Sequence, residues 1–309
     1  MVATQTAVRN AYQAGLVVPA FNIPYLPMME PVIRAIVDED SFALVAVARL
    51  EWIKFEAQSQ AAVMAEFRRH RRPGYVNIHQ DHIPVIDEDN LQVDYLTELK
   101  QALALGYESV MIDGSRLPLA ANIAATRQAV ALAHAAGIPC EAELGAVWGH
   151  EAGPLPPYEE LFASGRGFTD VEEARVFVAE TGCDWLSVAI GNIHGAIAGV
   201  AKDQKKIEAR LHLDHLARLR EATGIPLVLH GGSGVRREDV LAAIQLGIAK
   251  INIGTEIRQA YEQRLRQTGS VAAAQEACYE RTVWLIRDYF GLSGTRRTII
   301  GQQQEAKPL

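Results

Sequence analysis

The stretch PLVLHGGSG, residues 226–234, carries the pattern that decides the fold. Its first four residues form an apolar run of strand length, which is typical of a buried parallel strand. His230 follows at once, and then come three glycines and a serine, Gly231, Gly232, Ser233 and Gly234. Glycine lets backbone N–H groups turn toward a bound anion. The stretch therefore predicts a strand end that carries a histidine of the metal-ligand type beside an anion-binding loop.

Seven further runs of this kind occur, so the sequence predicts eight strands; the other runs lie at 17–22, 42–48, 75–81, 109–115, 139–145, 185–191 and 250–256. Helical patterns separate them, for example at 96–105, 122–136, 171–181 and 238–246, and each of these four stops just before a glycine. Eight strands that alternate with helices over about 250 residues predict an α/β fold, the (β/α)8 or TIM barrel. A doubly wound open sheet is the alternative, but no GxGxxG fingerprint follows the first run.

The composition is that of an ordinary globular protein. The 309 residues are 49% hydrophobic and carry a formal charge of −7 without a block of basic residues, which argues against a nucleic-acid partner. Three widely spaced cysteines argue against a disulfide framework and against a CxxC zinc site. The N-terminus lacks a signal-peptide pattern, and no run has the length of a membrane helix. We therefore expect a cytoplasmic protein with no membrane partner, and small polar substrates remain open.

Polar residues gather where the predicted strands end. In a TIM barrel these ends meet at one face, so the residues there form one set: Asn22, His79, Asp81, His82, Asp113, Glu141, Glu143, Asn192, His194, His230, Asn252 and Thr255. Histidines from three strand ends can bind a divalent metal and leave a position open for a substrate. Strand alternation would point Asp81 and His82 to opposite sides. We expect the backbone to turn there and to bring both inward.

The motifs resemble, in the same order, those of the class II, metal-dependent ketose-bisphosphate aldolases, which act on fructose or tagatose bisphosphate. The matching motifs are VPAFN at 18–22, HxDH at 79–82, SVMIDGS at 109–115, EAELG at 141–145, FTDxEEA at 168–174, AIGNIHG at 189–195, PLVLHGGSG at 226–234 and KINIGTE at 250–256. This resemblance implies a divergent aldolase that cleaves or forms a phosphorylated ketose through a zinc-stabilised dihydroxyacetone phosphate enediolate. It also implies a homo-oligomer, a dimer or tetramer.

The resemblance implies roles for single residues. His82, His194 and His230 would hold the catalytic Zn²⁺. Asp81 would handle the hydroxyl proton as the carbon–carbon bond breaks or forms. Glu151 lies in the loop after EAELG and would remove a proton from the triose carbon, although a solvated loop glutamate is the alternative.

Further roles concern a second cation and the substrate. Asp113 and Glu143 match residues that hold a second metal in some relatives, and a hydrogen-bonded structural pair is the alternative; a monovalent cation is also possible. The substrate and its phosphate would be bound by Asn22, Gly195, Gly231, Ser233, Asn252 and Thr255. In relatives a neighbouring arginine near the C-terminal end reaches a distal phosphate, and the sequence does not select which arginine, if any, would do so here.

Two further residues, His215 and Lys250, are of types that could serve in catalysis, but neither fits this scheme. His215 ends a second HxDH motif, HLDH at 212–215, where Asp214 would cap a helix that covers 216–220. We therefore expect His215 in the outer ring, away from the metal. Lys250 would suit a Schiff-base mechanism, but it starts the last predicted strand run. We expect it to lie at the end of the barrel away from the chemistry.

Departures from the family pattern leave the substrate open. Ala48 replaces an expected serine, Gly254 stands where fructose-bisphosphate enzymes carry aspartate, no lysine follows the NIHG motif, and the segment 83–94 differs from its counterparts. These changes concern sugar recognition rather than metal binding. Another metal-dependent lyase or isomerase of sugar phosphates is the second hypothesis, and a non-catalytic phosphate binder is the third. We expect one domain over 1–309, with a helical extension from about residue 259.

Overall fold

The computed structural model describes residues 3–147, 157–193, 209–232 and 234–301. Eight parallel strands close into a barrel in sequence order, with the last strand paired to the first. The strands are β1 (Val18–Asn22), β2 (Ala43–Ala48), β3 (Val76–Pro84), β4 (Ser109–Asp113), β5 (Cys140–Leu144), β6 (Trp185–Val188), β7 (Leu227–Leu229) and β8 (Ile248–Ile253). Every predicted strand run overlaps one of these strands, so the predicted TIM barrel is confirmed.

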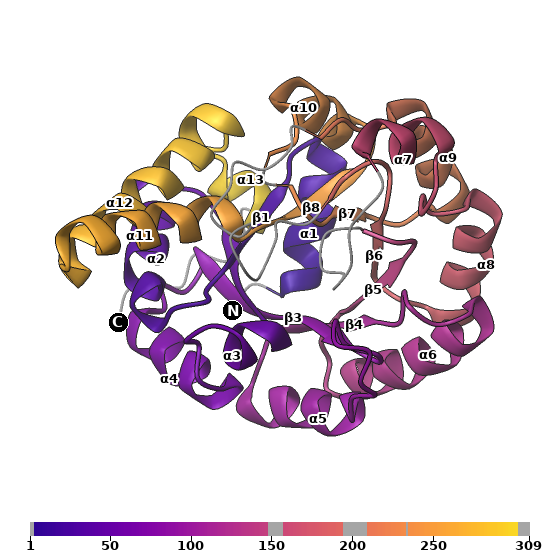
Figure 1. The fold of residues 1–309 in the computed structure, drawn as a ribbon, viewed down its shortest axis with the longest axis horizontal. Coiled ribbons are helices and arrows are strands. Elements are labelled where there is room, and N and C mark those ends of the chain that lie inside the picture. The colour runs from indigo at the N-terminus through magenta and orange to yellow at the C-terminus, as the bar shows by residue number, and fades with distance from the viewer. Residues whose placement is uncertain (1–2, 148–156, 194–208, 233, 302–309) are drawn as a thin grey trace.

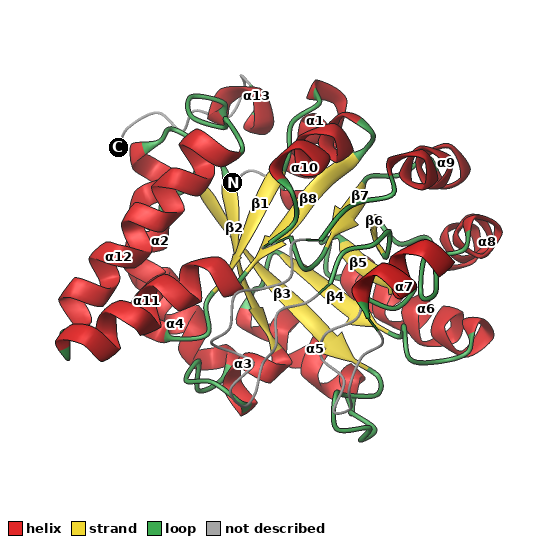
Figure 2. Cartoon of the chain, turned by 45° about the horizontal axis from the view of Figure 1, so that its top comes forward, coloured by secondary structure: helices red, strands yellow, loops and turns green. Residues whose placement is uncertain are grey.

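Helices form a ring around the strands (Figures 1 and 2). The ring contains α2 (Met29–Asp38), α4 (Gln60–His70), α5 (Tyr95–Leu105), α6 (Leu119–Ala135), α8 (Val171–Thr181), α9 (Leu213–Thr223), α10 (Arg237–Gln245) and α11 (Thr255–Thr268). Shorter pieces are η1 (Leu26–Met28), α3 (Arg49–Ile53) and α7 (Tyr158–Ser164), and the chain goes on through α12 (Val271–Trp284), η3 (Leu285–Tyr289) and α13 (Arg296–Ile300). Helix α12 packs against α11 and α2. Among the described helices, none combines the length and the apolar character that crossing a bilayer requires.

Helix α1 (Thr4–Ala14) closes the N-terminal end of the barrel and lies in the middle of the ring in Figure 1. Its residues Ala7, Val8 and Ala11 are fully buried and belong to the same apolar cluster as Val18 and Phe42, which lie near the starts of β1 and β2. A second, larger apolar cluster fills the space between the strands and the outer helices. Because apolar packing closes one end of the barrel, the polar strand ends are left to form a site at the other end.

Strand β3 carries the irregularity that the site requires. Its pairing register with β4 shifts between Gln80 and Ile83, and His82 has a φ of 32°, in the left-handed region that residues with a side chain rarely adopt. Asp81 and His82 consequently both reach residues of the barrel interior, Asn22 and His230 respectively. The predicted turn of the backbone at this strand end is confirmed.

Candidate active site

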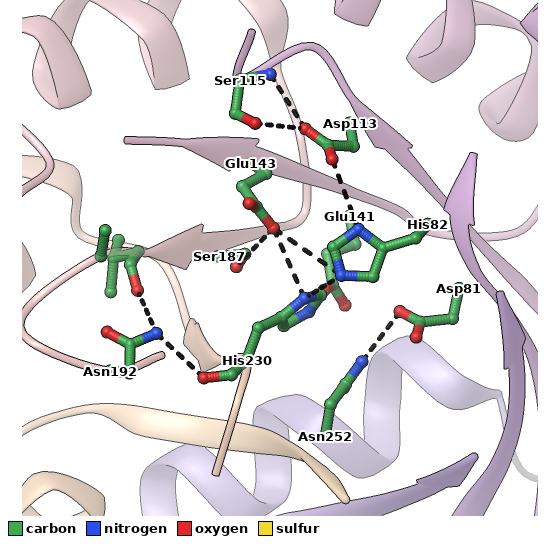
Figure 3. A network of polar contacts seen from close by, with 12 residues as sticks. Asp81, His82, Asp113, Ser115, Glu141, Glu143, Ser187, Asn192, His230 and Asn252 are labelled. Atoms are coloured by element: carbon green, nitrogen blue, oxygen red, sulfur yellow. Dashed lines mark hydrogen bonds and ion pairs between the residues drawn. The ribbon is translucent and has the colours of Figure 1, made fainter. Parts of the chain in front are cut away.

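Two histidines from opposite parts of the barrel face each other at its mouth (Figure 3). The Nε2 atom of His82 lies 2.5 Å from the Nδ1 atom of His230. The outer nitrogens face carboxylates: His82 Nδ1 is 3.5 Å from Asp113 Oδ2, and His230 Nε2 is 2.7 Å from Glu141 Oε1. Glu143 Oε2 lies 3.4 Å from His230 Nδ1. The inner nitrogens therefore converge on one point, and carboxylates fix the orientation of both rings.

The donor set at this point suits a cation. Burial lowers the pKa of His82, but the charges of Asp81, Asp113 and Glu143 outweigh this effect and raise the pKa to about 10. Burial and the charge of Asp113 raise the pKa of Glu143 to about 8. Ligand atoms of Asp81, His82 and His230 all lie within 4.8 Å of one another, as do those of His82, Asp113 and Glu143. Groups that retain protons because negative charge is concentrated around them can exchange these protons for a divalent metal. Histidine nitrogens and carboxylate oxygens are ligands that zinc takes in proteins, so this donor set fits zinc.

Asp81 is held by two amide groups. Asn22 donates from Nδ2 to Asp81 Oδ2 over 2.8 Å, and Asn252 donates from Nδ2 to Asp81 Oδ1 over 2.8 Å. The carboxyl group is almost completely buried. Burial raises the pKa of Asp81, but the positive charges of His82 and Lys250 outweigh this effect and hold the pKa well below its usual range. Asp81 is thus an ionised carboxylate with a fixed orientation.

Lys250 lies close to these groups, so the expectation that it lies away from the chemistry is wrong. Its Nζ atom is 2.6 Å from Asn252 Oδ1 and 2.8 Å from Glu141 Oε2, and the side chain is fully buried. Strand β8 begins at Ile248, so Lys250 stands in mid-strand and shares a face with Asn252 two residues later. Its long side chain then reaches along the barrel interior toward the mouth.

Sequence reasoning did not single out Glu51. Its Oε2 atom accepts hydrogen bonds from the backbone N–H of Ala48, over 2.8 Å, and from Asn22 Nδ2, over 3.5 Å. Burial raises the pKa of Glu51 to about 8, with a further contribution from the charge of Asp81. A glutamate three residues after the end of a strand is the signal that could have found it, because this is the N3 position of a helix that begins there.

Several predicted site residues lie outside the described part of the chain, namely Glu151, His194, Gly195 and Ser233. Gly231 directly follows β7 and its His230 and has a φ of 66°, which a glycine adopts without strain. Thr255 is the first residue of α11, just after β8. Asn192 donates from Nδ2 to the carbonyl oxygen of His230 over 2.9 Å. The ends of β6, β7 and β8 thus lie on the same side of the barrel as the two histidines.

Asp113 and Glu143 have partners of their own. Asp113 Oδ1 accepts from the backbone N–H of Ser115 over 2.9 Å and from its hydroxyl over 2.6 Å. Glu143 Oε2 accepts from the Ser187 hydroxyl over 3.1 Å. These contacts agree with a structural pair, and the proximity of both carboxylates to His82 agrees with a second metal site. Both interpretations remain predictions.

The second HxDH motif lies in the outer ring, as expected. His215 is in α9 and its Nε2 atom is 2.7 Å from the carbonyl oxygen of Thr169. The prediction that Asp214 caps this helix is wrong. The helix begins at Leu213, so the cap is His212, which accepts from the backbone N–H of His215. Asp214 stands in the first turn instead.

A small cavity opens beside His82. It is lined by Leu50, His82, Pro84, Ile86, Glu88, Asp113 and Arg116. Part of this wall comes from the segment 83–94, whose sequence departs from the family pattern. Salt bridges hold the segment against α3, since Arg49 pairs with Asp87 over 3.1 Å and Lys54 pairs with Glu88 over 3.0 Å. A divergent part of the sequence therefore shapes the surroundings of the candidate metal ligand.

A (β/α)8 barrel with a histidine and carboxylate cluster at its mouth is a typical enzyme architecture. The family model described as "Fructose-bisphosphate aldolase class-II" matches residues 2–293. This chain therefore belongs to the class II fructose-bisphosphate aldolase family, whose members are carbon–carbon lyases.

Solved structures of similar proteins agree with this assignment. The YdjI aldolase from Escherichia coli K12 is 28% identical, with a TM-score of 0.74 over 96% of this chain and 100% of the other. A putative fructose-1,6-bisphosphate aldolase from Coccidioides immitis is 25% identical, with a TM-score of 0.75 over 96% of this chain and 98% of the other. Fructose-bisphosphate aldolase from Campylobacter jejuni, at 18% identity, has a TM-score of 0.69 over 93% of each chain and shows the shared fold.

Proposed function

We propose that this protein is a zinc-dependent aldolase that cleaves and forms a phosphorylated ketose of the bisphosphate type, with dihydroxyacetone phosphate as the triose. The observation that carries the proposal is the convergence of His82 Nε2 and His230 Nδ1 next to the buried carboxylate of Asp81. His194 would complete the set of metal ligands. When bound, zinc would supply a Lewis acid that stabilises negative charge on the ketone oxygen.

Asp81 would move the proton of the hydroxyl group whose carbon leaves as the aldehyde. Its carboxylate is ionised, and Asn22 and Asn252 hold one oxygen each, so it is prepared to accept a proton without first being reoriented. Asn252 would also contact the enediolate. Glu151 would transfer the proton at the triose carbon. The two proton transfers thus belong to different residues.

The phosphate of the triose would be bound between the ends of β6, β7 and β8. Gly195, Gly231 and Ser233 would contribute from the first two ends and Thr255 from the third. Thr255 begins α11, a helix of 14 residues, so the backbone N–H groups of its first turn have no partners within the helix. This part of a TIM barrel commonly binds phosphate groups.

Further parts of the proposal come from the family resemblance and from composition. They are a second metal or a monovalent cation near Asp113 and Glu143, a homo-oligomeric assembly, a cytoplasmic setting and a single domain in which the helices after about residue 259 extend the barrel. Metal content after gel filtration, with the molar mass measured by light scattering, would test the cations and the assembly together.

The central experiment combines metal analysis with two activity assays. Purified protein should contain zinc, lose cleavage of ketose bisphosphates in EDTA and regain it when zinc is returned. Detritiation of dihydroxyacetone phosphate tests the shared half-reaction even when the aldehyde partner is unknown. A zinc-loaded protein that neither cleaves any member of a panel of ketose mono- and bisphosphates nor exchanges the triose proton would overturn the proposal.

A further inference from the structure

Lys250 is a lysine that is completely buried inside the barrel, where an ammonium group is tolerated only if its charge is paired. Its two partners are Glu141 Oε2, at 2.8 Å, and Asn252 Oδ1, at 2.6 Å. Each partner touches a group of the candidate active site. Glu141 contacts His230, and Asn252 contacts Asp81. The ammonium group therefore connects the contact between Glu141 and His230 with the contact between Asn252 and Asp81.

The contact with Asn252 decides which way its amide points. An ammonium group only donates hydrogen bonds, and an ionised carboxylate only accepts them. Lys250 therefore requires Oδ1 of Asn252 on its side, which leaves Nδ2 to donate to Asp81. Without the ammonium group, the amide is free to turn and to place its oxygen against the carboxylate of Asp81. That orientation would place two acceptors against each other.

The contact with Glu141 acts on the histidine side. Glu141 uses one oxygen for Lys250 and the other for Nε2 of His230. The carboxylate accepts the proton of Nε2, so Nδ1 of His230 is left without a proton and faces His82.

We propose that Lys250 is a positioning residue that fixes Asn252 and Glu141 together, so that one buried ammonium group orients both the donor to Asp81 and the partner of His230. Lys250 does not act as a Schiff-base lysine, because its ammonium group is paired with two buried partners. The effect on turnover rests on the proposed aldolase activity, whereas the effect on zinc binding rests only on the proposed metal site.

The first test measures zinc affinity by competition with a chromophoric chelator. Lys250→Met removes the group that positions Glu141, the partner of His230, so zinc should bind at least about tenfold more weakly than in the parent. In the Glu141→Gln background, Lys250→Met should change zinc affinity less than about threefold, because the carboxylate that Lys250 positions is gone. Lys100→Met, at an exposed position of α5, is the control for loss of one charge. Unchanged or tighter zinc binding in Lys250→Met, or an equal loss of affinity in both backgrounds, would contradict the proposal.

The second test asks whether Lys250 acts through Asn252. In the Glu141→Gln background, Lys250→Met should lower kcat about 30-fold and change KM less than about threefold, since it disturbs orientation rather than substrate binding. When Asn252→Ala is added to the same background, Lys250→Met should lower kcat less than about threefold, because the group that Lys250 orients is gone. If the two substitutions lower kcat by factors that simply multiply, Lys250 does not act through Asn252. A parent protein without activity, but with the expected zinc affinities, would refute the proposed function and leave the role of Lys250 in the metal site standing.

Discussion

Gly254 packs directly against Asn22. A Cβ atom placed on Gly254 would lie 3.3 Å from the Cβ atom of Asn22, which is closer than ordinary van der Waals contact. Asn22 in turn donates to Asp81 and contacts Glu51. The missing side chain at position 254 is therefore part of what lets Asn22 approach the proposed acid/base.

This packing predicts the effect of placing at position 254 the aspartate that is expected in fructose-bisphosphate enzymes. Gly254→Asp should lower kcat for the native substrate about tenfold or more, because the new side chain displaces Asn22 and adds a negative charge near Asp81. Gly254→Ala tests the steric part alone and should have a smaller effect. Steady-state kinetics on ketose bisphosphates, with melting temperatures to monitor folding, would measure both. Full activity of Gly254→Asp with native stability would show that Asn22 adapts and that the close contact has no functional role.

The two HxDH motifs make a matched pair of variants. His82→Ala should lose zinc at stoichiometric concentration and lower turnover by a factor of about 1000 or more, because a candidate ligand at the point of convergence is removed. His215→Ala should retain zinc and most of its activity, since the residue bonds to Thr169 in the outer ring. Zinc content by atomic absorption and the cleavage rate would be measured for both. Loss of zinc from the His215 variant alone would reverse the assignment of the motifs.

The raised pKa of Glu51 predicts that the stability of the folded chain depends on pH. Its pKa is about 8 in the folded chain and that of an ordinary glutamate when unfolded, so between these values the folded chain binds an extra proton. Stability of the metal-free protein should therefore fall as the pH rises from about 4.5 toward 8, by a few kcal/mol at most, since one pKa unit corresponds to about 1.4 kcal/mol. Glu51→Gln removes this contribution and should make the profile less steep, while Glu143, whose pKa is also raised to about 8, keeps its own contribution. Urea midpoints at several pH values would show this, and parallel profiles for the two proteins would contradict it.

Periodicity and glycine spacing predict the barrel well, because a parallel strand is a short apolar run and several helices end at a glycine. The turn at β3 was predictable from the requirement that Asp81 and His82 share one face. The position of Lys250 was not predictable, because it depends on where β8 begins. The strand begins at Ile248, two residues before the predicted start, and this difference moves the long side chain toward the mouth of the barrel. Glu51 was missed for a related reason. Its partners, Asn22 and Asp81, come from strands that only the closed sheet brings next to β2.

The last prediction concerns the two separate proton transfers that are assigned to Asp81 and Glu151. Asp81 is assigned to the hydroxyl proton of the ketose and Glu151 to the proton on the triose carbon, so each variant should lose a different half of the reaction. Asp81→Asn keeps the shape and the burial of the side chain. It should abolish cleavage while leaving measurable exchange of the triose proton with solvent deuterium, because that exchange needs no proton transfer at the leaving hydroxyl. Glu151→Gln should lose exchange and cleavage together.

Deuterium incorporation into dihydroxyacetone phosphate, followed by proton NMR, would measure the first reaction, and a coupled assay of aldehyde release would measure the second. Zinc content should stay at the level of the parent protein in both variants, which separates a proton-transfer defect from loss of the metal. If Glu151→Gln exchanges the triose proton at the parent rate, another residue carries that step. If Asp81→Asn loses exchange as completely as cleavage, the two roles are not separate, and Asp81 serves both proton transfers or the binding of the triose itself.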